Sequence, residues 1–198
     1  MPEHTAQTRH AEVSTDLGET LLGASDDALV GCYFVDQHHL PNRDLPNRDA
    51  FGPRVSAADS DPVLGLAGRQ LTEYLAGERQ EFTVMLSTSG DDFKEQVWAL
   101  LREIPFGTTT TYGALATSLG DRLLAQRVGR AVGRNPIGVF IPCHRVIGAD
   151  GSLTGCAGGL DRKKFLLELE EPAEMREVRL LRVGYPGSRC PIQCTYVH

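Results

Sequence analysis

A cysteine followed directly by a histidine is the clearest chemical feature of this sequence. The pair stands in the run Ile141-Pro142-Cys143-His144-Arg145-Val146. The thiolate is the reactive form of cysteine, and a nearby base or positive field raises its population at neutral pH. A Cys-His pair alone is a weak signal, but here a basic helix is expected before it and a glycine-rich loop after it. We therefore interpret Cys143 as a nucleophile that is activated by His144.

The arginines near this pair form a basic region in an acidic chain. The 198-residue chain has a net charge of −6, which argues against a general nucleic-acid binder. Residues 107–148 hold five arginines and one aspartate, so this stretch is net +4 and the remainder net −10. Arg127, Arg130 and Arg134 recur at i, i+3 and i+7 and would share one face of a helix. Such a patch is typical of a local phosphate contact, although a solvated face is the default for any single arginine.

Two short helices joined by a glycine are expected to carry this basic face. The pattern predicts helices over residues 112–119 and 121–134, with Gly120 between them. Thr111 and Asp121 are suitable N-caps, because their side-chain oxygens can accept from free N–H groups of the first turn. The arrangement is typical of a helix-turn-helix, and the alternative is a helical hairpin packed in a core.

The remaining apolar patterns predict a mixture of strands and helices. In chain order they indicate a β-hairpin over 21–35, a helix over 62–76, a strand over 82–86, a helix over 92–104 capped by Asp92, and a strand or extended segment over 137–141. Residues 37–61 are expected to be a loop, and they contain a tandem Leu-Pro-Asn-Arg-Asp copy that we interpret as an insertion.

The composition, at 41% hydrophobic and 23% charged, is that of an ordinary globular protein. The sequence has no run of 18 apolar residues, which a membrane-spanning helix would need. Residues 1–12 lack the apolar core of a secretory signal. Five cysteines without framework spacing favour reduced thiols over a disulfide scaffold. We therefore expect a cytoplasmic protein with no membrane partner.

Several further residues stand at informative spacings from Cys143 along the sequence. They are Arg134-Asn135-Pro136 before it, Gly158-Gly159 after it, and Tyr112 and Glu170. With Pro142-Cys143-His144-Arg145-Val146, this set resembles the O6-alkylguanine-DNA alkyltransferase family, the methylated-DNA–protein-cysteine methyltransferases. The close match covers residues 93–170, and a looser similarity extends over residues 17–82.

The resemblance implies an α/β fold in two parts. The first is a small N-terminal α/β domain with an antiparallel, ribonuclease H-like sheet. The second is a mainly helical, winged-helix-like C-terminal domain that contains the helix-turn-helix. We place a disordered N-terminus at 1–15, the N-terminal domain at 16–88, the DNA-binding and alkyl-transfer domain at 89–175, and a C-terminal tail at 176–198.

The resemblance also implies DNA repair by direct reversal. The helix-turn-helix would bind double-stranded DNA through the minor groove, and an O6-alkylguanine would rotate out of the stack into a pocket. Cys143 would take the alkyl group, with O4-alkylthymine as a second candidate substrate. A thioether is not hydrolysed under mild conditions, so this methylated-DNA–[protein]-cysteine S-methyltransferase would act only once. We also expect a monomer that needs no cofactor and no metal.

Individual roles follow from the same resemblance. His144 would be the base, acting through a water because adjacent side chains in extended backbone diverge, and Glu170 would orient it. Tyr112 would contact the target base and the rotated phosphate and donate a hydrogen bond to the departing guanine, while Asn135 would tie the helix-turn-helix to the active-site segment. The expected DNA contacts are Tyr112, Gln126, Arg127, Arg130 and Arg134, and the expected base pocket is Met85, Val146, Cys156, Ala157 and Gly158.

Two positions depart from the family's pattern. Gln126 stands nine residues before Asn135, where the family usually has an arginine that replaces the flipped base in the stack. Either Gln126 fills this gap or a local shift lets Arg127 do so, and the lost charge predicts weaker duplex binding or slower flipping. Cys156 stands where an aromatic is usual. It predicts a larger pocket and a possible oxidative bridge to Cys143, or it simply packs as a small hydrophobe.

Other residues and functions stay open at this point. The tail residues Cys190, Cys194 and His198 offer a zinc site or a frayed end, and Cys32 is expected to pack in a sheet. Arg162 and Lys163 are either phosphate contacts or surface charges. The competing functions are a non-catalytic damage binder or transcription regulator, which the presence of Cys143 disfavours, and a Cys-His hydrolase, which gives no reason for the arginine face.

Overall fold

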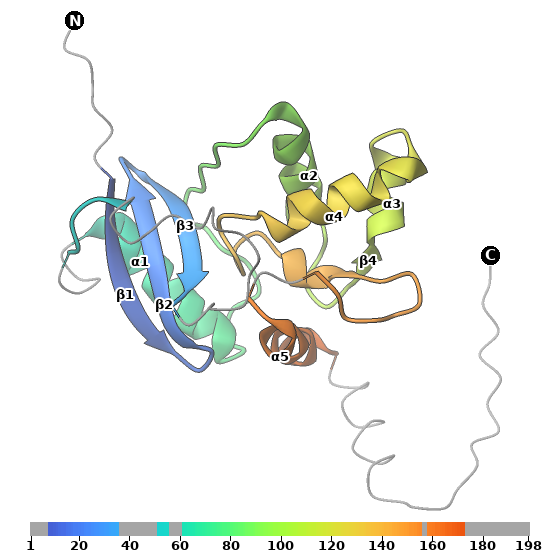
Figure 1. Cartoon of the computed structure of the whole chain (residues 1–198). Coiled ribbons are helices and arrows are strands. Elements are labelled where there is room, and N and C mark those ends of the chain that lie inside the picture. The colour runs from blue at the N-terminus through green and yellow to red at the C-terminus, as the bar shows by residue number, and fades with distance from the viewer. Residues whose placement is uncertain (1–7, 36–50, 56–60, 156–157, 173–198) are drawn as a thin grey trace, which may run out of the picture.

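The computed structural model describes residues 8–35, 51–55, 61–155 and 158–172. In this part of the chain a sheet with one covering helix lies beside a group of helices and short strands (Figure 1). The tandem copy, both Cys156 and Ala157, and the tail that holds Cys190, Cys194 and His198 fall outside the described residues. No helix of the described residues is long and apolar enough to cross a membrane.

The N-terminal half is built on a three-stranded antiparallel sheet. Its strands are β1 (Thr8–Thr15), β2 (Gly18–Ser25) and β3 (Ala28–Phe34), in the order β1-β2-β3. The β2–β3 pair confirms the predicted hairpin. The prediction of disorder up to residue 15 is wrong for β1, which pairs with β2 along its whole length. Its polar composition hid the strand, because backbone pairing needs no particular side chains.

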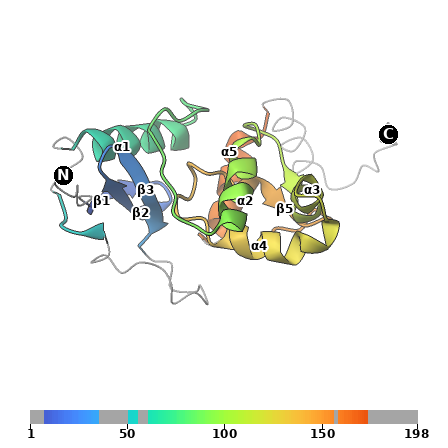
Figure 2. The same cartoon turned by 90° about the horizontal axis from the view of Figure 1, so that it is seen from above.

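Helix α1 (Pro62–Leu75) packs on the sheet, as the apolar spacing predicts. In the view from above it lies across the sheet on one side (Figure 2). Asp61 fixes its start, because one carboxylate oxygen accepts from the N–H groups of Val63 and Leu64 at 3.0 and 2.9 Å. The other oxygen pairs with Arg9 of β1, which joins the helix start to the sheet.

The predicted strand over 82–86 is only an extended segment with one bridge. Leu86 pairs in parallel with Leu29 of β3, and the Leu29 N–H donates to the Met85 carbonyl at 2.8 Å. The buried Gln70 side chain of α1 accepts from the Thr83 N–H at 2.9 Å. A side chain thus takes the place of a neighbouring strand along this segment.

The C-terminal half contains three helices before the Cys-His pair: α2 (Asp92–Arg102), α3 (Tyr112–Ser118) and α4 (Ala125–Gly133). Thr111 caps α3 as predicted. Asp121 instead caps a 3-10 turn, Arg122–Leu124, that precedes α4. The cap of α2 is Asp91 rather than Asp92, since Asp91 accepts from the Lys94 N–H at 3.0 Å.

Short elements close this half around the pair. Strand β4 (Thr110–Thr111) is parallel to β5 (Val146–Ile147), and α5 (Leu160–Glu170) follows.

Trp98 of α2 donates its indole N–H to the Ala131 carbonyl at 2.9 Å, which fixes α2 against α4. Helix α4, which packs against α3, is therefore held on α2.

The segment 137–141 is not extended as predicted, but turns back on itself. The Ile141 N–H donates to the Ile137 carbonyl at 2.9 Å, and Val139 has a φ of 70°. The segment is anchored on β3, because Cys32 donates to the Pro136 carbonyl at 2.9 Å and accepts from Gly138 at 3.2 Å. The edge of the N-terminal sheet thus holds the loop that leads to the Cys-His pair.

Candidate active site and DNA-binding face

Cys143 and His144 lie on a 3-10 turn, Cys143–Arg145, and not on extended backbone as expected. With 3.0 residues per turn, neighbouring side chains point about 120° apart, so the two still diverge. Both are buried: 6% of Cys143 and 1% of His144 are exposed. This divergence does not favour a direct bond between the two side chains.

Glu170, at the end of α5, is the centre of the hydrogen-bond network behind His144. Its Oε1 accepts from His144 Nε2 at 2.7 Å and also from the Tyr74 hydroxyl. Its Oε2 accepts from Arg145 Nε at 2.9 Å and from the Gly107 N–H at 3.1 Å. Burial alone would raise the pKa of Glu170, but the bonds from His144 and Arg145 outweigh it and hold the pKa at about 2.

This ionised carboxylate fixes the state of the imidazole. Because a carboxylate only accepts, His144 Nε2 must carry a hydrogen, a tautomer inferred from the network. Burial lowers the pKa of His144 despite the opposing effect of Glu170, so the ring is neutral near pH 7. Its Nδ1 is buried and has no hydrogen-bond partner among the described residues. His144 therefore offers an unprotonated Nδ1 as a base.

Arg145 was counted with the basic region in the sequence, and the structure corrects this. Its side chain is buried, with 7% of the residue exposed, and its guanidinium is paired with Glu170. It also donates Nη1 to the Ile104 carbonyl at 2.5 Å. Its positive charge is therefore paired with Glu170 inside the protein and does not belong to the exposed basic face.

Lys163 and Arg162 are also not the phosphate contacts or surface charges expected. Lys163 is 0% exposed and donates Nζ to the carbonyls of Val146 at 2.5 Å and Thr154 at 2.6 Å. Arg162 donates Nε to the Leu17 carbonyl at 2.8 Å, and its guanidinium lies 4.3 Å from the centre of the Phe34 ring. Both residues hold the active-site segments in place.

Asn135 joins the end of α4 to the segment before Cys143. Its Nδ2 donates to the Ile141 carbonyl at 2.8 Å, and its Oδ1 accepts from the Ile137 N–H at 3.0 Å. Only 5% of the residue is exposed. One amide therefore satisfies both sides of the turn over 137–141.

Tyr112 lies between α4 and the loop after β5. Its hydroxyl donates to the Thr154 carbonyl at 2.8 Å, and its ring lies beside Gly129, where a Cβ would be 3.6 Å away. At Gly155, which has a φ of +63°, a Cβ would come within 2.5 Å of the Tyr112 hydroxyl oxygen. The glycine therefore allows the ring to reach this loop.

The outer face of α4 carries the residues expected to contact DNA. Gln126, Arg127, Arg130 and Arg134 are exposed, whereas Val128, Ala131 and Val132 face the core. The Arg127 guanidinium stacks 3.8 Å from the centre of the Phe93 ring of α2. This contact holds Arg127 toward α2, so a shift of Arg127 into the place expected for Gln126 is not favoured.

The structure describes three of the five expected pocket residues: Met85, Val146 and Gly158. Val146 is buried, and the Gly158 carbonyl accepts from Arg162 Nη1 at 3.1 Å. Met85 is 67% exposed, because the adjacent Val84 takes the buried side of its segment. The structure therefore does not support Met85 as a pocket wall, and Cys156 and Ala157 lie outside the described residues.

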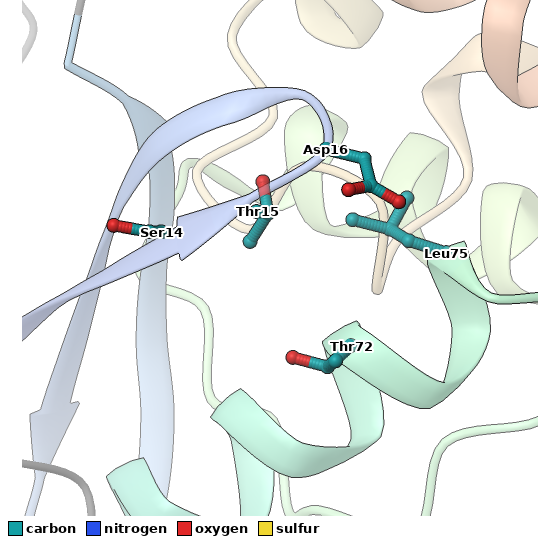
Figure 3. A pocket seen from close by; sticks show the side chains of 5 residues that line it. All are labelled: Ser14, Thr15, Asp16, Thr72 and Leu75. Atoms are coloured by element: carbon teal, nitrogen blue, oxygen red, sulfur yellow. The ribbon is translucent and has the colours of Figure 1, made fainter.

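Two cavities lie elsewhere. One, of about 280 Å³, is formed by Ser14, Thr15 and Asp16 with Thr72 and Leu75 of α1 (Figure 3). The hydroxyls of Thr15 and Thr72 already donate to main-chain carbonyls. The other, of about 470 Å³, lies between β5 and α5 and has Glu170 in its wall, but not Cys143. No group of three or more metal-ligating side chains occurs among the described residues.

Known proteins resemble this chain along most of its length. Residues 92–172 match the family described as 6-O-methylguanine DNA methyltransferase, DNA binding domain. A methylated-DNA–protein-cysteine methyltransferase of Methanosarcina acetivorans is 53% identical over 164 residues, which are 81% of this chain and 97% of the relative. One of Mycobacterium leprae is 40% identical over 161 residues, which are 80% of this chain and 90% of the relative.

Solved structures agree with these relatives. Mycobacterium tuberculosis OGT in complex with DNA has a TM-score of 0.71 and 36% identity, over 84% of this chain and 97% of that one. An O6-methylguanine DNA methyltransferase of Methanococcus jannaschii shares the fold, with a TM-score of 0.56 and 23% identity over 94% of this chain and 99% of that one. The family resemblance expected from the motif is confirmed: this chain belongs to the methylated-DNA–protein-cysteine methyltransferase family.

Proposed function

We propose that this protein repairs double-stranded DNA by moving the alkyl group of O6-alkylguanine, and of O4-alkylthymine as a second candidate, onto Sγ of Cys143. The observation that carries the proposal is the buried hydrogen bond between His144 and Glu170. It places a neutral imidazole, with its Nδ1 as a base, next in sequence to the thiol. Family membership and the exposed basic face of α4 support the same substrate.

The chemistry balances without any added group. The Cys143 thiol gives its proton to His144 Nδ1 through a water, and the resulting imidazolium is stabilised by Glu170. The thiolate attacks the alkyl carbon, an S–C bond forms and the C–O6 bond breaks, with its electron pair leaving on guanine. His144 then releases the proton it took from the thiol and the guanine anion takes up one proton, so both groups end neutral. The thioether product is stable, so each molecule acts once.

Tyr112 and Asn135 support this reaction in different ways. Tyr112 donates to Thr154 in the free protein, so it must exchange that partner to donate to the departing guanine or the rotated phosphate. Asn135 keeps the turn before Cys143 joined to α4, which bears the DNA-binding face. Binding to the helix and presentation of the thiol are thereby linked in one rigid segment.

The DNA-binding face reads as a helix-turn-helix, α3 followed by α4, that enters the minor groove. Gln126 would fill the place of the flipped base without charge, since Arg127 is stacked on Phe93. Arg130 and Arg134 would neutralise phosphates, and affinity would fall as salt is raised. Val146, Gly158 and the loop with Cys156 and Ala157 would enclose the flipped base.

The finer architecture is part of the same proposal. The three-stranded sheet with α1 would be a reduced ribonuclease H-like domain, now extended to begin by Thr8. Residues 89–175 would be the winged-helix-like domain for DNA binding and alkyl transfer. We propose that the protein acts on DNA as a monomer in the cytoplasm.

A labelled duplex tests the function. The protein is incubated with DNA whose O6-methylguanine carries a radioactive methyl group, and Cys143→Ser and Cys32→Ser are compared with it. We expect up to one equivalent of label on the wild type and on Cys32→Ser, because burial raises the pKa of Cys32 to about 12 and makes it a poor nucleophile. Cys143→Ser should bind the duplex and take no label.

Other outcomes identify the competing functions. Binding by the wild type without transfer of label would indicate a lesion sensor. Repeated turnover of an ester or amide would indicate a hydrolase. Label on Cys143→Ser equal to that on the wild type would place the acceptor elsewhere.

A further inference from the structure

Tyr74 reaches the site from the other half of the molecule. It belongs to α1, near its C-terminal end, and it is 0% exposed. Its hydroxyl donates to Glu170 Oε1 and lies 3.3 Å from His144 Nε2. The ring is held by Phe82 at 5.0 Å and by Phe106 in an edge-on contact at 6.2 Å between ring centres. Such packing leaves the hydroxyl little freedom to choose another partner.

The hydroxyl competes with His144 for one carboxylate oxygen. Glu170 Oε1 accepts from Tyr74 and His144, and Arg145 Nη2 also donates to it at 3.0 Å. Burial, reinforced by the Glu170 charge, raises the pKa of Tyr74. The hydroxyl therefore keeps its proton and remains a donor at every pH at which the protein is folded. Each donor on Oε1 takes up part of the charge that would otherwise stabilise a proton on the imidazole.

We propose that Tyr74 is a positioning residue of the alkyl-transfer site, which holds Glu170 Oε1 against His144 Nε2 so that Nδ1 stays the proton acceptor. The inference rests on the proposed function, in which His144 is the base. It gives the N-terminal half an indirect part in the chemistry, although that half carries neither the thiol nor the DNA-binding helix. The tyrosine acts through Glu170 and His144, and it need not touch the substrate.

The charged and titratable groups around His144 set the direction of the expected effect. They are Glu170 and Lys163 on α5, Arg145 and Cys143 on the same turn, and Tyr74 on α1. Loss of the Tyr74 hydroxyl removes one donor from Oε1 and leaves more of the carboxylate charge facing His144. The imidazolium is then favoured in the resting protein, so less free base is present at a given pH.

Tyr74→Phe tests this with Tyr33→Phe as the matched control. Tyr33 is another tyrosine of the N-terminal half, and it packs on Phe51 at 5.8 Å between ring centres. For Tyr74→Phe we expect the acidic limb of the single-turnover rate to move to higher pH by the order of half a unit to one unit. At a given pH on this acidic limb the rate should fall about 3- to 10-fold, and it should recover at higher pH. Tyr33→Phe should follow the wild type.

Nitrogen NMR of ¹⁵N-histidine-labelled protein gives a readout that does not need DNA. In the wild type His144 should be the Nε2–H tautomer, with a downfield Tyr74 hydroxyl proton close to it, and in Tyr74→Phe the ring should titrate at higher pH. An unchanged His144 titration and pH–rate profile in a folded Tyr74→Phe would overturn the inference. So would a wild type without the hydroxyl proton near His144, a result that stands even if the variant does not fold.

The two proposals fail in different ways. A wild type that takes no label from O6-methylguanine, but whose His144 titration responds to Tyr74→Phe, contradicts the proposed function alone. A wild type that transfers label, with His144 indifferent to Tyr74, contradicts the inference alone.

Discussion

Glu170 collects donors from α1, from the turn that bears Cys143, and from the loop before β4. At the scale of residues, this one carboxylate determines both the tautomer of His144 and the place of the Arg145 charge. The motif around Cys143 predicted Cys143, His144 and Glu170 as partners. It did not predict Arg145, Lys163 or Tyr74, because the burial of a charged or polar side chain depends on contacts between distant segments.

The depressed pKa of Glu170 makes stability depend on pH. The pKa of Glu170 is about 2 in the folded protein, against a usual value of 4.5. The ionised carboxylate therefore stabilises the fold by about 3 kcal/mol above pH 4.5, and this stabilisation is lost as the pH falls through 2. The lowered pKa of His144 acts in the same direction, since the unfolded chain takes up its proton first as the pH falls below 6.5. Glu170→Gln should be about 3–5 kcal/mol less stable at pH 7, because it strands Arg145.

Urea unfolding at a series of pH values measures this effect. The gap between Glu170→Gln and the wild type should narrow steadily from pH 4.5 toward pH 2. A gap that stays constant over this range would show that Glu170 is not the group that titrates.

Gln126 is the second residue with a measurable consequence. Gln126→Arg adds a charge on the exposed face of α4, where Arg127 is held away by Phe93. We expect tighter duplex binding, a steeper dependence on salt by about one phosphate contact, and faster single-turnover repair. Gln96→Arg, exposed on α2, adds the same charge elsewhere and is the control. Equal affinities for the two variants would remove the role assigned to position 126.

At the scale of elements, α4 and the turn over 137–141 behave as one unit because Asn135 bonds to both ends of the turn. The glycine between α3 and α4 and the Thr111 cap were readable from the sequence, since both are local signals. The turn itself was not, because its apolar, β-branched residues favour a strand. Its shape comes from Asn135 and from the Cys32 backbone on β3, which are tertiary contacts.

Asn135→Ala tests this unit. It leaves the Ile141 carbonyl and the Ile137 N–H buried without their partner, at a cost of about 1–3 kcal/mol each. Alkyl transfer should slow more than DNA binding weakens, because the turn presents Cys143 while α4 keeps its surface. Urea unfolding, single-turnover rates and duplex affinity measure the three effects, with the exposed Gln96→Ala as control. A stable variant with an unchanged rate would contradict the account.

At the scale of the whole molecule, the two halves are joined by backbone and side chains close to the site. Cys32 of β3 pairs with Pro136 and Gly138, and Arg162 of α5 bonds to Leu17 and Gly158. The apolar patterns predicted a mixture of strands and helices and the resemblance implied an α/β fold, but neither predicted these connections. Strand β1 was missed for the same reason, since its place is fixed by pairing with β2.

Arg162→Lys tests the side-chain connection while it keeps the charge. A lysine loses the forked donors and the flat contact with Phe34, so we expect a loss of stability of about 1–2 kcal/mol and slower transfer through a looser Gly158 loop. Arg69→Lys, exposed on α1, is the matched control. Identical unfolding midpoints for the two variants would show that Arg162 contributes no more than a surface arginine.

In the proposed reaction Cys143 takes one alkyl group and is consumed. Peptide mapping by mass spectrometry, after reaction with an excess of O6-methylguanine duplex, tests it most directly. We predict one methyl group per molecule, on the peptide that contains Cys143, with no further reaction when fresh duplex is added. A methyl group on a different residue, or continued demethylation by protein already modified at Cys143, would contradict the account.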